Sequence, residues 1–133
     1  MQVADLENEL LNYWVAKALS LPVVFDGAVH WDGEVPASFE KMIGRALEPG
    51  EAPSLDFVGD KALGHSVIEW IGVTVERPIP NQVTRRWRAV ADWRGERVSH
   101  RFCGPESCIG ETALIAAMRV VVAVTFGKTV PDM

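Results

Sequence analysis

Cysteine and long hydrophobic runs are scarce in this sequence of 133 residues. Its two cysteines, Cys103 and Cys108, are too few for the disulfide framework of a small secreted protein. The longest apolar stretch, residues 113–126, is shorter than the roughly 20 residues that span a bilayer, and it contains Arg119. The N-terminus carries acidic residues where a signal peptide would carry Lys or Arg. These absences predict a cytoplasmic protein that is not anchored in a membrane.

A basic excess is also missing, because 13 Lys and Arg face 18 Asp and Glu, for a formal net charge of −5. Such a balance is not typical of a protein that coats nucleic acid, although it leaves room for a local basic patch. Hydrophobic residues make up 48% of the chain. A chain of this length and composition can bury a core, so we expect residues 1–133 to form a single domain.

Catalytic and metal-binding motifs are absent or incomplete. The patterns G-x-S-x-G, G-x-x-x-x-G-K-[ST], G-x-G-x-x-G and H-E-x-x-H do not occur, so no catalytic constellation is legible. His100, Cys103 and Cys108, with His65 as a fourth ligand, have the residue types that zinc takes, but structural zinc sites typically use more closely paired ligands. We therefore predict free thiols, no metal and no cofactor.

The first half of the chain predicts two helices and a hairpin. Apolar residues at three- and four-residue steps predict a helix over residues 4–20, which ends before Pro22. Asp26-Gly27 between two apolar runs predicts a two-residue turn that pairs Phe25 with Ala28 and Val24 with Val29. A short helix is expected within residues 36–47, then a loop over 48–54 and irregular structure through residue 66.

The second half predicts strands and a final helix. Residues 67–76, 84–94 and 97–103 read as strands, and the prolines of residues 78–82 require a loop. Residues 111–127 are apolar nearly all round, which fits a buried helix, while the β-branched run 120–122 makes a strand the alternative. Length, alanines and Gly127 favour the helix. The predicted fold is α+β: an antiparallel sheet of two hairpins and a connecting strand, packed on one face by the N- and C-terminal helices.

Arginines gather around the predicted turn at Gly95-Glu96. Residues 85–101 hold six arginines against two acidic residues, a net charge of +4, so the remainder of the chain carries −9. A two-residue turn pairs Trp93 with Val98 and Ala89 with Phe102, which keeps apolar residues on one face of both strands. The other face then carries five arginines: Arg86, Arg88, Arg94, Arg97 and Arg101. This face is either an anion-binding surface for nucleic acid or an acidic protein, or the solvated side of a sheet.

Two tryptophans and one arginine invite interpretation as parts of a ligand site. Trp14 and Trp87 fall on predicted core faces, so packing explains them first, and we expect Trp14, Val122 and Phe126 to share one core. Arg119 lies within the apolar helix, where a buried guanidinium must be paired. A salt bridge in the core is the simplest expectation.

The two ends of the chain resemble a known family. Residues 11–19, LNYWVAKAL, and residues 111–133 are similar to the opening and closing motifs of the NinX-like proteins, small phage and prophage proteins of unknown function. The matching residues include Trp14, Lys17, Met118 and Arg119. Departures are Thr112-Ala113 in place of Thr-Pro and a shortened acidic tail. The resemblance implies a phage accessory protein in the host cytoplasm and contributes no activity.

These observations leave three classes of function open. The leading one is an accessory protein, monomer or homodimer, that binds a host or phage macromolecule, either protein or nucleic acid. The second is a small-molecule or nucleotide-binding module that uses Arg119 and Trp14. An enzyme comes third.

Overall fold

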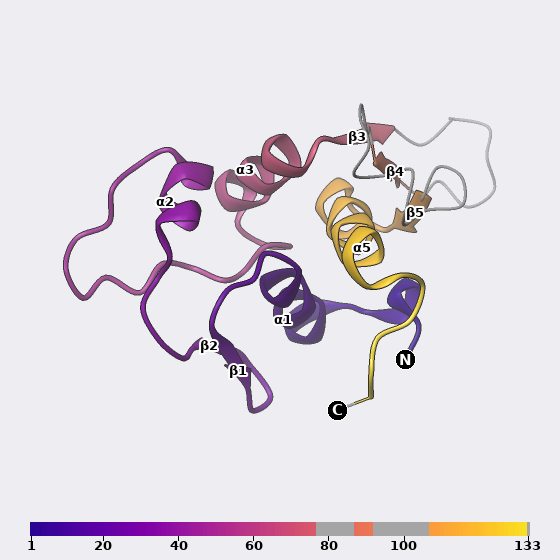
Figure 1. Cartoon of the computed structure of the whole chain (residues 1–133). Helices are drawn as coiled ribbons and strands as arrows, with labels where there is room; N and C mark the ends of the chain where they lie inside the picture. The colour runs from indigo at the N-terminus through magenta and orange to yellow at the C-terminus, as the bar shows by residue number, and fades with distance from the viewer. Residues whose placement is uncertain (77–86, 92–106, 133) are drawn as a thin grey trace.

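The computed structural model describes residues 1–76, 87–91 and 107–132 (Figure 1). The fold is α+β, as predicted, with both of its described sheets antiparallel: β1 with β2, and β3-β4-β5. The elements follow in this order: a 3-10 turn η1 (Val3–Asp5), α1 (Asn8–Ala18), β1 (Val23–Phe25), β2 (Val29–Trp31), α2 (Ala37–Ile43), α3 (Lys61–Ile71), β3 (Val73–Glu76), β4 (Trp87–Ala91), β5 (Ser107–Gly110) and α5 (Ala113–Phe126).

The helix α5 lies at the centre, between α1 on one side and the sheet β3-β4-β5 on the other (Figure 1). The hydroxyl of Thr112 caps its N-terminus by accepting a hydrogen bond from the backbone N–H of Ile115, and Gly127 ends it. Its β-branched residues Val120, Val121 and Val122 are all buried, because neighbours surround this part of the helix. Because the helix is buried on several sides, it has no need of a polar face. The predicted buried helix is therefore confirmed.

The helix α1 packs against α5 and the β1–β2 hairpin. The predicted helix over residues 4–20 is confirmed in shorter form, since residues 3–5 make a separate 3-10 turn and α1 begins at Asn8. The predicted arrangement, with both terminal helices on one sheet, is wrong in one respect. Among the described residues only α5 covers β3-β4-β5 extensively, while α1 packs on the opposite side of α5.

The β1–β2 hairpin forms at the predicted place with a different register. Phe25 pairs with Val29 and Val23 with Trp31, so the connection has three residues, not the two predicted, and the pairing of Phe25 with Ala28 is wrong. The extra residue places the apolar side chains of both strands on the side facing the protein, while Val24 and His30 share the exposed side. Burial on one face therefore decided the register over the Asp-Gly turn signal.

The helix α2 is confirmed within residues 36–47 but ends at Ile43. Gly44 follows in the left-handed region at φ 77°, and its N–H donates to the carbonyl of Glu40. Leu47, which the periodicity placed on the helix, lies in the loop beyond it.

The largest correction concerns residues 61–71, which form the helix α3 where we predicted irregular structure followed by a strand. Asp60 caps the helix by accepting from the N–H of Leu63, and Gly72 ends it at φ 84°. The strand β3 therefore keeps only residues 73–76 of the predicted 67–76. The spacing of the apolar residues in this segment is compatible with both a strand and a helix. The capping residues at its two ends favour the helix.

The predicted pairing of residues 84–94 with 97–103 is wrong where it can be compared. Ala89 lies between Val75 of β3 and Cys108 of β5, so its predicted partner Phe102 is not its neighbour. Ala89 is fully buried and Trp87 half-buried against the helices, which confirms the apolar face of β4. The Gly95-Glu96 turn and the partners of Trp93 lie outside the described residues.

Candidate functional site

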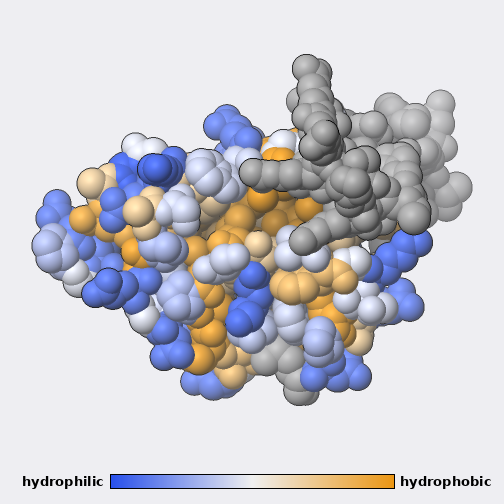
Figure 2. All heavy atoms as spheres, in the orientation of Figure 1, coloured by the Kyte–Doolittle hydropathy of each residue, from blue (hydrophilic) through white to orange (hydrophobic). Residues whose placement is uncertain are grey.

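A cavity of about 750 Å³ lies between α3, the sheet and the first turn of α5. Most of its wall is apolar, and hydrophobic surface emerges between α3 and α5 on the face drawn in Figure 2. Its apolar lining includes Val58, Ile68, Val73, Val75, Trp87 and Leu114. The volume is within the range of about 300 to 1,000 Å³ that is usual for small-molecule pockets.

One edge of this cavity is polar. Lys61 and His65 lie one turn apart on α3, so both project from the same side of that helix. Glu111 and Thr112 line the wall at the start of α5. The arrangement suits a ligand with a large apolar part and a few polar atoms, which is the usual pattern of recognition in such pockets.

The loop that leads into α3 is held by a buried amide. Asn12 is 1% exposed; its side-chain Nδ2 donates to Asp56 Oδ1 at 3.1 Å, and its Oδ1 accepts from the N–H of Val58 at 3.2 Å. Asp56 also accepts from the N–H of Gly59 at 3.1 Å. These bonds tie the cavity lip at residues 58–59 to α1, and the aspartate belongs to this scaffold.

The helix α3 packs closely against α5 at Gly64, beside the cavity-lining residue Leu114. A Cβ at Gly64 would lie 2.5 Å from Leu114 Cδ2 and 2.9 Å from the carbonyl oxygen of Phe57. Because it has no side chain, Gly64 lets Leu114 of α5 and the backbone of Phe57 come close to α3. From the sequence we had expected irregular structure at this glycine. The cap at Asp60 was the signal that could have revealed the helix.

Arg119 joins three parts of the fold through backbone carbonyls. Its Nε donates to the carbonyl of Leu6 at 2.9 Å, and its Nη1 donates to that of Ile109 at 2.7 Å. The expected salt bridge is wrong for the described residues, because none of their carboxylates forms an ion pair with this guanidinium. A polar depression beside it includes Asp5, Glu7 and Glu111.

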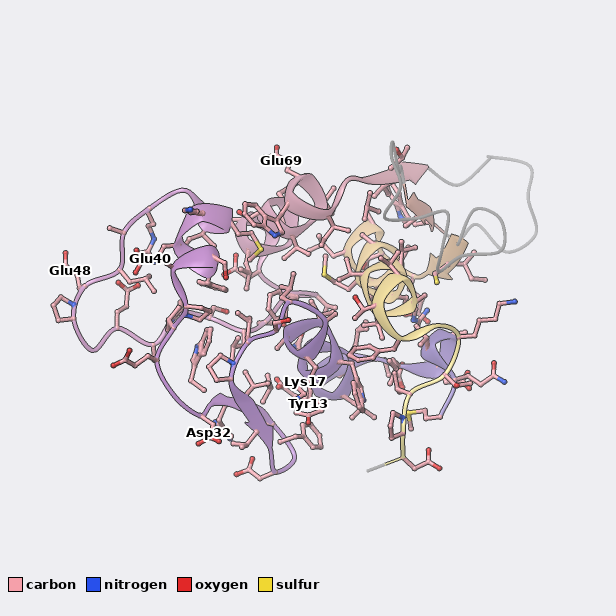
Figure 3. The ribbon with its side chains drawn as sticks, viewed as in Figure 1. Tyr13, Lys17, Asp32, Glu40, Glu48 and Glu69 are labelled. Atoms are coloured by element: carbon pink, nitrogen blue, oxygen red, sulfur yellow. The ribbon has the colours of Figure 1, made fainter. Side chains whose placement is uncertain are left out.

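The other residues of the family resemblance do not join Arg119 in one site. Trp14 is 7% exposed, its ring centroid lies 5.4 Å from that of Phe126, and its Nε1 meets no acceptor among the described residues. Met118 is fully buried, whereas Lys17 is exposed beside Tyr13 on the outer side of α1 (Figure 3). Trp14 and Met118 are thus core residues. Figure 3 also shows Glu40, Glu48 and Glu69 spread over α2, its following loop and α3.

Most of the predicted arginine face lies outside the described residues, namely Arg86, Arg94, Arg97 and Arg101. Arg88 is in β4, where the register sets it directly between Glu76 of β3 and Ile109 of β5. Ile109 is 48% exposed, and Thr74, two residues from Glu76 on β3, is exposed as well. The helices among the described residues therefore leave part of this sheet face open.

The predicted metal ligands are likewise only partly described. His65 lines the cavity, and Cys108 is half-buried on β5, whereas His100 and Cys103 lie outside the described residues. Within the described ranges no helix combines the length and the apolarity that a membrane crossing requires.

No protein-family model matches this chain, and no curated protein matches it either. The resemblance to the NinX-like phage proteins stays a prediction.

Proposed function

We propose that this chain is a binding module for a small, mainly apolar ligand, which occupies the cavity between α3, the sheet and the start of α5. The observation that carries the proposal is a volume of about 750 Å³ whose mostly apolar wall is built by side chains from separate elements. Apolar side chains offer water no hydrogen bonds. An apolar ligand that displaces this water removes hydrophobic surface from solvent, which favours binding. The module would act in the cytoplasm, and if the NinX-like resemblance holds, as a phage accessory protein in its host.

The test uses decanol as the apolar probe and calorimetry as the readout, because five tryptophans complicate fluorescence. We expect saturable binding to the full-length protein. Ala113→Phe should abolish that binding, since Ala113 lines the cavity and the larger ring would fill it. Ala37→Phe is the matched control, because Ala37 is the exposed first residue of α2 just as Ala113 is the first residue of α5. Binding that survives Ala113→Phe unchanged would refute this site.

A second candidate is the binding of a macromolecular partner, protein or nucleic acid, at the sheet face that carries Ile109. The favouring observation is that Ile109 and Thr74 are exposed there, on a sheet whose strand β4 belongs to the sequence segment 85–101 of net charge +4. If nucleic acid binds, affinity should fall steeply with salt, and Arg88→Gln should flatten that dependence by about one unit of the log–log slope.

A further inference from the structure

We infer that the ligand of this cavity is an amphipathic acid, whose carboxylate is held by Lys61 and His65 while its apolar body lies against the sheet and α5. This inference rests on the proposed binding module and names the class of its ligand. It is carried by the position of the two basic side chains on the cavity edge.

Lys61 has a position that the helix itself does not favour. It is the first residue of α3, and the partial positive charge at a helix N-terminus disfavours a cation there. Asp60 already caps the helix by accepting from Leu63 N–H at 3.2 Å, and no described carboxylate lies within salt-bridge distance of Lys61. A fixed positive charge that no described carboxylate neutralises therefore lies at the rim of an apolar cavity.

His65 adds a hydrogen-bonding group to the same edge. It follows Lys61 by four residues and is exposed, so both side chains can reach one group bound at the rim. An imidazole offers at least one N–H donor in either tautomer, which a carboxylate oxygen accepts. Together the two side chains supply charge and a donor to one carboxylate.

Glu111 is the opposing charge in the lining. It lines both the cavity and the depression that contains Arg119. The cavity edge formed by α3 carries no acidic lining residue among those described. The carboxylate of an acid that enters along α3 thus meets Lys61 and His65, while its apolar part is left to the apolar lining residues such as Val75, Trp87 and Leu114.

Three probes of equal chain length separate the charge from the hydrophobic contribution: decanoate, decanol and decylamine, each below its micelle concentration. With the full-length protein at pH 7.5 and low salt, we expect decanoate to bind about threefold to tenfold more tightly than decanol, and decylamine to bind most weakly. Lys61→Gln should lower the affinity for decanoate more than the affinity for decanol, and so remove most of the decanoate advantage. Lys41→Gln, which removes an exposed lysine on α2, is the matched control and should change neither affinity.

The outcomes distinguish the two proposals. Equal affinity for decanoate and decanol, or an equal loss of both in Lys61→Gln, would overturn the inference and leave the apolar binding module standing. Binding of decanoate that is blocked by Ala113→Phe and weakened by Lys61→Gln would support both. Failure of all three probes to bind would overturn the proposed function and this inference with it. Because Lys61 is exposed and its charge is disfavoured at the helix N-terminus, the variant should unfold at the same or a slightly higher urea concentration than the unmodified protein, which checks that it is folded.

Discussion

The two ends of α5 are both apolar, but one end is packed against other elements and the other borders a cavity. From Ala116 to Val124 the helix is enclosed by α1, the sheet and η1, and its side chains are buried except at Arg119. Its first turn, with Ala113 and Leu114 half-buried, borders the cavity instead. Apolar composition therefore does not by itself mean close packing, because whether a hydrophobic face meets other side chains or an open volume depends on its neighbours.

The largest expected effect is at the enclosed end. Met118 is fully buried, so Met118→Ala should lower the free energy of unfolding by about 2 to 5 kcal/mol. Leu114→Ala at the cavity end should cost less than about half of that, because Leu114 is already partly exposed. Urea unfolding of both variants measures the difference. Equal losses would mean that both ends of the helix are equally well packed.

The contact between α3 and α5 should respond to a single methyl group. Alanine favours a helix over glycine by about 1 kcal/mol, but the added Cβ at Gly64 meets Leu114 and the backbone of Phe57. We expect the clash to prevail, so that Gly64→Ala destabilises the protein by about 1 to 2 kcal/mol. In a Leu114→Ala background the loss should be smaller, because part of the obstruction is gone. A Gly64→Ala variant more stable than the original would contradict this packing.

Arg119 should matter for the links that it makes to backbone carbonyls. Arg119→Lys keeps the positive charge, but an ammonium cannot reproduce the fork that reaches Leu6 and Ile109 together. We expect a loss of about 1 to 2 kcal/mol in thermal or urea unfolding. Lys17→Gln, which removes an exposed charge of the N-terminal stretch 11–19, should stay within about 0.5 kcal/mol. A loss below about 0.5 kcal/mol in Arg119→Lys would show that the positive charge, and not the geometry of the guanidinium, is what counts at Arg119.

The smallest effect is expected far from α5, in the loop after α2. The Arg45 guanidinium donates to Glu51 at 2.7 Å, and this hydrogen bond is the main cause that lowers the pKa of Glu51. Because the folded pKa lies below the unfolded one, the pair stabilises the protein above the unfolded pKa and loses that contribution as the pH falls through the folded pKa. Both groups are exposed enough that solvent screening keeps the effect small. Carboxyl chemical shifts should show an acid-shifted Glu51 midpoint that rises in Arg45→Gln.

The predicted core at the end of the chain is confirmed for the buried residues Trp14 and Val122 but not for Phe126. Val122 is fully buried, and Trp14 packs edge-on against Phe126, as the helical spacing of both segments predicted. Phe126 itself is 39% exposed, so it closes the border of this core. Periodicity identifies a helical face, whereas the depth at which that face is buried depends on the elements around it.

The sequence alone determined the α+β class, the helices α1 and α5 and the position of the first hairpin, because regular periodicity and turn residues act locally. Tertiary structure decided the rest. It set the β1–β2 register by burying Val23 and Trp31 on one side, and it packed the helix α3 on α5 through Gly64. It also paired Arg119 with two carbonyls, and it brought residues 58–75 and 111–114 to one cavity. Such contacts join residues distant in the chain, and no local pattern encodes them.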